Sequence, residues 1–114
     1  VRNPRNWIIP DQVLFEYYRV VRNPLLFEKP LSAEKAARHL RFFREEVGWR
    51  HCAADTDCWR EAIALLARPG FDARRTFDLL LAVTLHRSGA QAVCTHTPAA
   101  FAGFGWLRLV DPLA

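Results

Sequence analysis

The chain has 114 residues, of which 51% are hydrophobic and 12% aromatic, so we expect one packed domain over residues 1–114 and no extensive disorder. No apolar run approaches the roughly 18 to 20 residues that a membrane span needs, and the first ten residues lack the apolar core of a signal peptide. We therefore expect a soluble cytoplasmic protein with no membrane contact. The net charge of +4 permits RNA or an acidic protein as a partner but selects neither.

The first elements in chain order are a strand over 6–10, closed by a proline, and a helix over 11–22. Asp11 is expected to cap this helix, and Asn23-Pro24 to end it. An apolar stripe at helical spacing predicts that the helix lies on a core; it comprises Leu14, Tyr17, Tyr18 and Val21.

A proline-bounded loop over 23–31 comes next. Ser32 is expected to cap a second helix over 33–46, and a short strand follows within 48–54. The later elements are helices over 55–70 and 76–88, a strand over 91–95, a loop over 96–105 and a strand over 106–110. Helices that alternate with short apolar strands favour an α/β fold with a parallel sheet.

The three cysteines do not predict a disulfide framework, because their number is odd and they are sparse. A zinc site would draw on His51, Cys52, Cys58, Cys94 and His96. However, no C-x-x-C pair occurs, so buried reduced thiols are the better interpretation.

Asp78 stands out because it lies inside the nearly all-apolar stretch "RRTFDLLLAVTLHRSG" (74–89). Such a helix should be largely buried, and an unpaired buried charge is costly. One explanation is structural, since an acid in the first helical turn interacts well with the helix dipole and the free N–H groups. The other is that a bound cation compensates the charge.

Glu16 is the second carboxylate of interest. It lies at the edge of the apolar stripe of helix 11–22, beside Val13 and Val20. It is either half-exposed in an ion pair or one of two carboxylates that share a divalent cation with Asp78. Mg²⁺ prefers oxygen ligands of this kind, and a bound metal can activate water and stabilise a phosphoryl transition state.

Two long segments resemble the PIN domain, particularly the VapC-type toxins of bacterial toxin–antitoxin pairs. "IIPDQVLFEYYRVVRNPLLFEKPLSAEKA" is similar to the family's strand, acidic helix and following loop. "ARRTFDLLLAVTLHRSGAQAVCTHTPAAFAGFGWLRLVDPL" is similar to its closing part, with an aspartate helix, a strand ending in threonine, a loop with F-x-G-F and a last strand near V-D-P.

The resemblance implies an α/β/α sandwich with a parallel sheet and a metal-dependent endoribonuclease that cleaves RNA by metal-activated water. It implies that Glu16 and Asp78 bind Mg²⁺ or Mn²⁺ and orient the attacking water. A cognate antitoxin and, commonly in the family, a homodimer are the implied protein partners. The candidates for contacting RNA near the two acids are Arg19, Arg22, Arg74 and Arg75, each of which could equally be an ordinary solvated arginine. His96 lies on the presumed active-site edge and could touch substrate.

Two departures from the family pattern leave rival interpretations open. The family's first strand, which carries an aspartate, and the helix after it have no counterpart here, so we expect a truncated product, a misplaced start, a fragment or half of an assembly. The family also often has acidic or amide side chains where this chain has Thr97 and Ala100. The alternatives are therefore a non-catalytic PIN-like protein that binds protein or RNA, and a plain interaction module in which both acids are structural.

Overall fold

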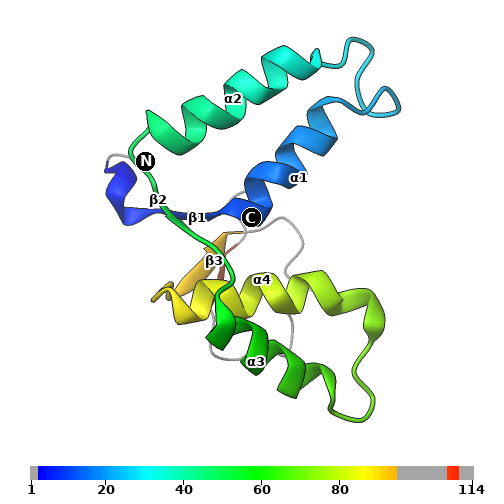
Figure 1. The fold of residues 1–114 in the computed structure, drawn as a ribbon, viewed down its shortest axis with the longest axis vertical. Coiled ribbons are helices and arrows are strands. Elements are labelled where there is room, and N and C mark those ends of the chain that lie inside the picture. The colour runs from blue at the N-terminus through cyan, green and yellow to red at the C-terminus, as the bar shows by residue number, and fades with distance from the viewer. Residues whose placement is uncertain (1–2, 95–107, 111–114) are drawn as a thin grey trace. The chain divides into compact units, whose positions relative to one another are not determined.

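The structure is a computed structural model that describes residues 3–94 and 108–110. The chain divides into two compact units, Val1–Ala53 and Ala54–Ala114. Each unit contains a pair of helices and a pair of short parallel strands (Figure 1). The predicted fold class, α/β with parallel strands, is confirmed.

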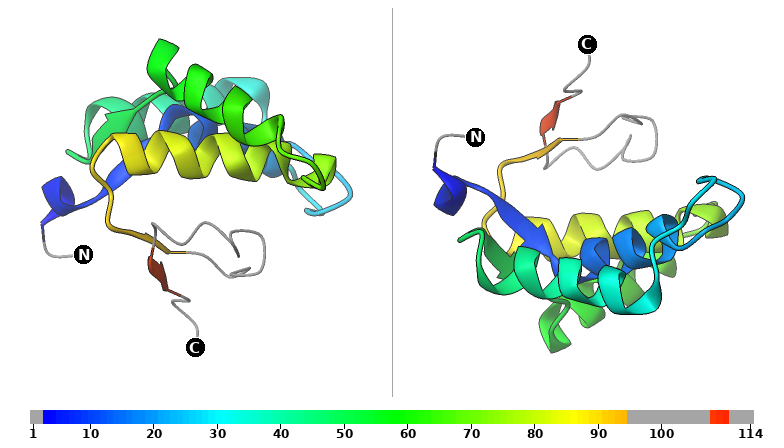
Figure 2. Two further views of the ribbon diagram at one scale, coloured as in Figure 1. Left: turned by 90° about the horizontal axis from the view of Figure 1, so that it is seen from below. Right: turned by 90° about the horizontal axis from the view of Figure 1, so that it is seen from above.

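The N-terminal unit begins with a 3-10 turn, Pro4–Asn6, followed by strand β1 (Ile8–Pro10) and helix α1 (Asp11–Val21). Helix α2 (Ala33–Glu45) and strand β2 (Arg50–Cys52) complete it. Strands β1 and β2 pair in parallel, with Ile9 opposite His51. The views in Figures 1 and 2 agree that α1 and α2 lie side by side and are joined by the loop before α2.

The starts of α1 and α2 follow different local rules. The Ser32 side chain accepts a hydrogen bond from the backbone N–H of Lys35 at 3.2 Å, so the predicted cap of α2 is confirmed. The prediction that Asp11 caps α1 is wrong. Pro10 occupies the capping position without a side-chain bond, and Asp11 is the first helical residue. Proline suits this place for two reasons. Its ring fixes φ near the observed −64°, and the helix requires no backbone N–H from the residue that precedes it.

An aromatic cluster holds α1 against α2. The hydroxyl of Tyr17 lies 2.8 Å from Nδ1 of His39, and its ring meets the edge of Phe43 with ring centres 5.2 Å apart. Phe43 also lies against Trp49, just before β2, at 5.8 Å. These rings pack between the helices, and the buried apolar residues among the described part of this unit are Pro10, Leu14 and Ala36.

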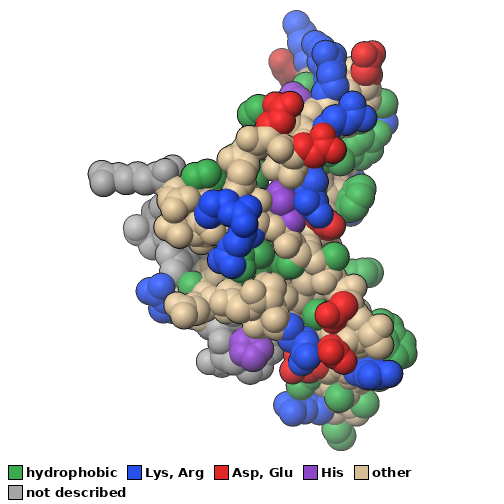
Figure 3. Space-filling view, turned by 60° about the vertical axis from the view of Figure 1, so that its left-hand side comes forward, with side chains coloured by type: hydrophobic (Ala, Val, Ile, Leu, Met, Phe, Trp, Pro, Cys, Tyr) green, Lys and Arg blue, Asp and Glu red, His purple; other side chains and the backbone are tan. Residues whose placement is uncertain are grey.

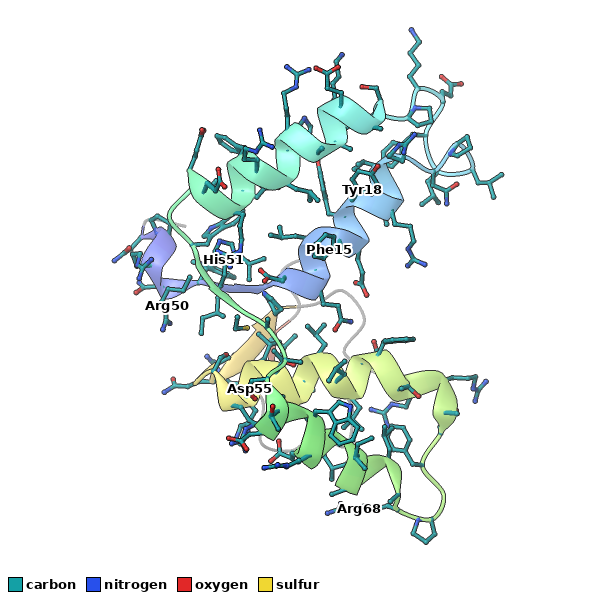
Figure 4. All side chains as sticks on the ribbon, viewed as in Figure 1. Phe15, Tyr18, Arg50, His51, Asp55 and Arg68 are labelled. Atoms are coloured by element: carbon teal, nitrogen blue, oxygen red, sulfur yellow. The ribbon has the colours of Figure 1, made fainter. Side chains whose placement is uncertain are left out.

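The C-terminal unit contains helix α3 (Thr56–Leu66), a 3-10 turn (Ala73–Arg75), helix α4 (Thr76–Arg87) and strands β3 (Ala92–Cys94) and β4 (Arg108–Val110). The two strands pair in parallel, with Val93 opposite Leu109. Asp55 lies at the start of α3 (Figure 4), where its side chain accepts the backbone N–H of Cys58 at 2.8 Å. The predicted helix over 55–70 ends earlier, at Leu66, because Arg68-Pro69-Gly70 forms a turn with Gly70 at φ 82°.

The packing of α4 explains its apolar sequence. The buried side chains of this helix are Leu79, Ala82, Val83, Thr84 and Leu85. The helix packs against α3, whose buried side chains are Cys58 and Ala62. The Thr84 hydroxyl donates to the carbonyl of Leu80 at 2.7 Å, so its polar group is satisfied inside the helix. The prediction of a largely buried helix is confirmed, except that Phe77 is 70% exposed.

None of the helices within the described ranges is long and apolar enough to cross a membrane.

Candidate active site

Glu16 lies on the exposed side of α1, one turn after Gln12. The side-chain amide of Gln12 donates to Oε1 of Glu16 at 3.3 Å. Within residues 3–94 and 108–110, no Lys, Arg or His forms an ion pair with Glu16. The ion-pair explanation offered by the sequence therefore has no support in the described residues.

Two predicted RNA-binding arginines, Arg19 and Arg22, are also exposed on α1 and its C-terminal cap. Arg22 donates to the hydroxyl of Tyr18 at 3.0 Å and lies over the Tyr18 ring, 5.6 Å from its centre. Figure 4 labels Tyr18 on α1. Neither guanidinium pairs with a carboxylate among the described residues. Both are therefore available to an anionic ligand.

Asp78 lies in the first turn of α4 and is half-buried. No side chain caps this helix, so its first N–H groups and its dipole favour a negative charge at this place. In the part of the chain that the structure describes, Asp78 has neither an ion pair nor a side-chain hydrogen bond. The structural and the metal-binding explanations of Asp78 both remain consistent with this geometry.

Arg74 and Arg75 occupy the 3-10 turn that leads into α4. The Arg74 guanidinium donates through Nη2 and Nε to Asp72, with a shortest distance of 2.9 Å. This pair lowers the pKa of the Asp72 carboxyl and raises the pKa of Arg74. Part of the donor capacity of Arg74 is therefore already used. Arg75 is half-buried and takes the N-cap position of α4.

The candidates His96 and Thr97 lie outside the described residues. The two carboxylates lie in different units, since Glu16 belongs to α1 and Asp78 to α4, so their convergence on one ion stays a prediction. Across the described ranges, no three side chains of the His, Cys, Asp or Glu type cluster closely enough to hold a metal ion. That also leaves the zinc interpretation without support in the described part of the chain.

The donor chemistry of Glu16 and Asp78 fits a hard divalent cation. Both present carboxylate oxygens, which Mg²⁺ and Mn²⁺ prefer over nitrogen or sulfur. Neither carboxylate is neutralised by a basic side chain within the described residues. The side chain of Gln12, which sequence reasoning missed, adds an oriented neutral donor next to Glu16. Its signal was present in the i, i+4 spacing of the two residues on a helix.

The surface charge does not by itself mark a path for RNA. On the face drawn in Figure 3, Lys and Arg side chains alternate with Asp and Glu rather than forming one continuous basic field. This pattern agrees with the modest net charge of +4. On this face, a preference for RNA would have to come from particular arginines rather than from a general basic surface.

The helices and parallel strand pairs are consistent with a PIN-like α/β fold, and sequence comparison agrees. The chain is 34% identical over 103 residues to Ribonuclease VapC24 of Mycobacterium tuberculosis, in both strain CDC 1551 / Oshkosh and strain ATCC 25618 / H37Rv. The match covers 90% of this chain and 70% of each relative. No family model matches the chain. The chain belongs to the family of VapC-type PIN-domain toxins.

Proposed function

We propose that this chain is a metal-dependent endoribonuclease of the toxin–antitoxin type. The observation that carries the proposal is the 34% identity to Ribonuclease VapC24 over 103 residues. Since only 11 of the 114 residues lie outside this match, Glu16 and Asp78 both fall within it. Support also comes from the two carboxylates, which have no basic partner in the described ranges and carry hard oxygen donors.

In the proposed mechanism, Glu16 and Asp78 would be the residues that hold Mg²⁺ or Mn²⁺ through their carboxylate oxygens. When bound, the cation supplies activation of water and stabilisation of the charge that develops on the phosphoryl group. Glu16 offers its second oxygen, because the first accepts the amide of Gln12. The attacking group is water, so one P–O bond forms, another breaks, and the protein carries no covalent intermediate.

The proposed RNA-binding arginines differ in whether their guanidinium groups already pair with a carboxylate. Arg19 and Arg22 carry guanidinium groups without a carboxylate partner within the described residues, so each can donate to a phosphate. Arg74 would have to share its donors with Asp72. The proposed protein partners are a cognate antitoxin and a second copy of the chain, and the proposed location is the cytoplasm, where RNA substrates are found.

The proposal is tested by cleavage of labelled RNA in Mg²⁺, in Mn²⁺ and in excess EDTA. We expect cleavage only with metal, and its loss in Glu16→Gln and Asp78→Asn. The matched controls are Glu28→Gln and Asp57→Asn, which neutralise other exposed carboxylates of the two units. Equal cleavage by the site variants and the controls would rule out the assigned ligands.

The second candidate function is RNA or protein binding without catalysis. It is favoured by Thr97 and Ala100, which stand where the family often has acidic or amide side chains. This candidate predicts RNA binding that EDTA leaves unchanged and no cleavage at any metal concentration. The same RNA substrates, assayed by gel shift and by cleavage in parallel, separate the two functions.

A further inference from the structure

We propose that Gln12 is a positioning residue whose side-chain amide holds the Glu16 carboxylate in the orientation that receives a divalent cation. This inference rests on the proposed function, in which Glu16 is a metal ligand. The amide Nε2 of Gln12 lies 3.3 Å from Oε1 of Glu16, with the two residues four positions apart on α1. This spacing places both side chains on one face of the helix.

The chemical nature of the donor matters more than the strength of this bond. An amide fixes one carboxylate oxygen but brings no positive charge, so the full negative charge of Glu16 remains for a cation. A lysine or arginine in the same place would orient the carboxylate and also compete with the metal. Hydrogen bonds to a metal-binding carboxylate commonly serve this orienting purpose, and their loss typically weakens metal affinity by about 10- to 100-fold.

The contrast with Asp11, on the same helix, supports this interpretation. The carboxylate of Asp11 accepts a hydrogen bond from Nε of Arg44 at 2.9 Å and is thereby neutralised. Glu16 has basic neighbours along its own helix, yet Arg19, three residues on, forms no ion pair with it. Helix α1 thus carries one carboxylate that pairs with a neighbouring helix and one that has no basic partner within residues 3–94 and 108–110.

The position of Gln12 in the fold adds a second reason. It is the second residue of α1, directly after β1, whose parallel partner is β2. Ligands of open α/β sheets bind beyond the carboxyl ends of the strands. Gln12 therefore lies at the end of the sheet where a ligand site is expected, and it is less exposed than Glu16.

The test measures Mn²⁺ affinity of the full chain by calorimetry, with melting temperatures to verify folding. Gln12→Met keeps the length and helix propensity of the side chain but removes the donor. Gln12→Lys places a cation next to Glu16. Gln91→Met is the matched control, since Gln91 is exposed at the amino-terminal side of β3 and away from the carboxyl end. Glu16→Gln calibrates the contribution of the ligand itself.

We expect Mn²⁺ affinity to fall about 10-fold in Gln12→Met and further in Gln12→Lys, with no change in Gln91→Met. The rate of RNA cleavage at saturating Mn²⁺ should return close to that of the wild type in Gln12→Met, because a positioning role alters the metal requirement rather than the chemistry. Unchanged affinity in Gln12→Met, with a clear loss in Glu16→Gln, would overturn the role of Gln12 alone. Unchanged affinity in Glu16→Gln, or no Mn²⁺ binding by the wild type, would overturn the proposed ligand and the inference together.

Discussion

The carboxylate of Asp11, the first residue of α1, accepts a hydrogen bond from Nε of Arg44, near the end of α2, at 2.9 Å. This bond joins two helices across 33 positions of sequence. Both side chains are partly exposed, so the pair contributes only about 0.2 to 1 kcal/mol to stability. Asp11 therefore links α1 to α2 through this pair and does not cap α1 as expected.

The first prediction concerns this ion pair. Arg44→Met should lower the free energy of unfolding by less than about 1 kcal/mol, and the difference should shrink at high salt because exposed charges are screened. Urea denaturation at low and high NaCl measures it. Arg41→Met is the control, because Arg41 lies on the same helix and has no ion pair within the described residues. A loss that persists at high salt would show that Arg44 acts through packing instead.

The second prediction concerns the hydroxyl of Tyr17, which lies 2.8 Å from Nδ1 of His39. Tyr17→Phe keeps the edge contact with Phe43 but leaves a partly buried histidine nitrogen without its partner, so we expect a loss of about 1 kcal/mol. Tyr18→Phe is the matched control. Its hydroxyl accepts from Arg22 in an exposed position, where water can replace the bond, and the loss should be smaller. Equal losses in the two variants would contradict a special role for the contact with His39.

Local features of the fold were predictable from the sequence. Ser32 was identified as a cap because its side chain only needs to reach a backbone N–H three residues on. The apolar sequence of α4 likewise predicted its burial. The pairing of Asp11 with Arg44 and of Tyr17 with His39 was not predictable, because these contacts depend on how two helices pack and not on spacing along either one.

The candidate site also has features that are predictable from the sequence and features that are not. Glu16 and Asp78 were singled out because carboxylates on apolar helices are unusual, and the family resemblance then suggested their roles. Whether each arginine is free to bind a phosphate depends on the side chains that surround its guanidinium group in the fold. Arg74 is held by Asp72, whereas Arg22 lies on Tyr18 with its charge uncompensated within the described residues. The i, i+4 spacing of Gln12 and Glu16 permits their hydrogen bond, but spacing alone does not distinguish a positioning amide from an ordinary surface glutamine.

The third prediction concerns the core of the C-terminal unit. Leu79 is 1% exposed, so Leu79→Ala removes buried contacts and leaves a cavity at a cost of about 2 to 5 kcal/mol. Phe77→Ala, two residues earlier on the same helix, should have a much smaller effect because Phe77 is 70% exposed. Thermal unfolding followed by circular dichroism compares the two. A large loss in Phe77→Ala would mean that its ring is covered by something else in solution.

The fourth prediction concerns acid stability. The hydrogen bond that Asp55 accepts from the backbone N–H of Cys58 lowers the pKa of its carboxyl group from the ordinary value of 3.8, and a hydrogen bond with the Cys58 side chain lowers this pKa further. A carboxyl group with a lowered pKa in the folded state stabilises the fold above its unfolded pKa, and this contribution disappears as the pH falls through the folded value. The melting temperature should therefore fall on acidification below about pH 4.

Asp55→Asn keeps a capping side chain without a titrating group, so its melting temperature should depend less on pH in this window. Asp57→Asn is the neighbouring control, and identical pH profiles for wild type and Asp55→Asn would contradict the prediction.

The fifth prediction concerns the arginines of α1 and RNA. If Arg22 donates to a phosphate, Arg22→Gln should weaken binding of single-stranded RNA and reduce the slope of log affinity against log salt by about 0.7, the value for one phosphate contact. The same reasoning applies to Arg19→Gln.

Arg68→Gln removes an exposed charge after α3 that is not assigned to the RNA path, so it should leave the slope unchanged. Binding is measured by fluorescence anisotropy over a series of salt concentrations, in EDTA to prevent cleavage. Equal slopes for Arg19→Gln, Arg22→Gln and the wild type would remove these two residues from the RNA path. An equal fall in all three variants would instead point to the general charge of the protein, because contacts through particular phosphates are lost one arginine at a time.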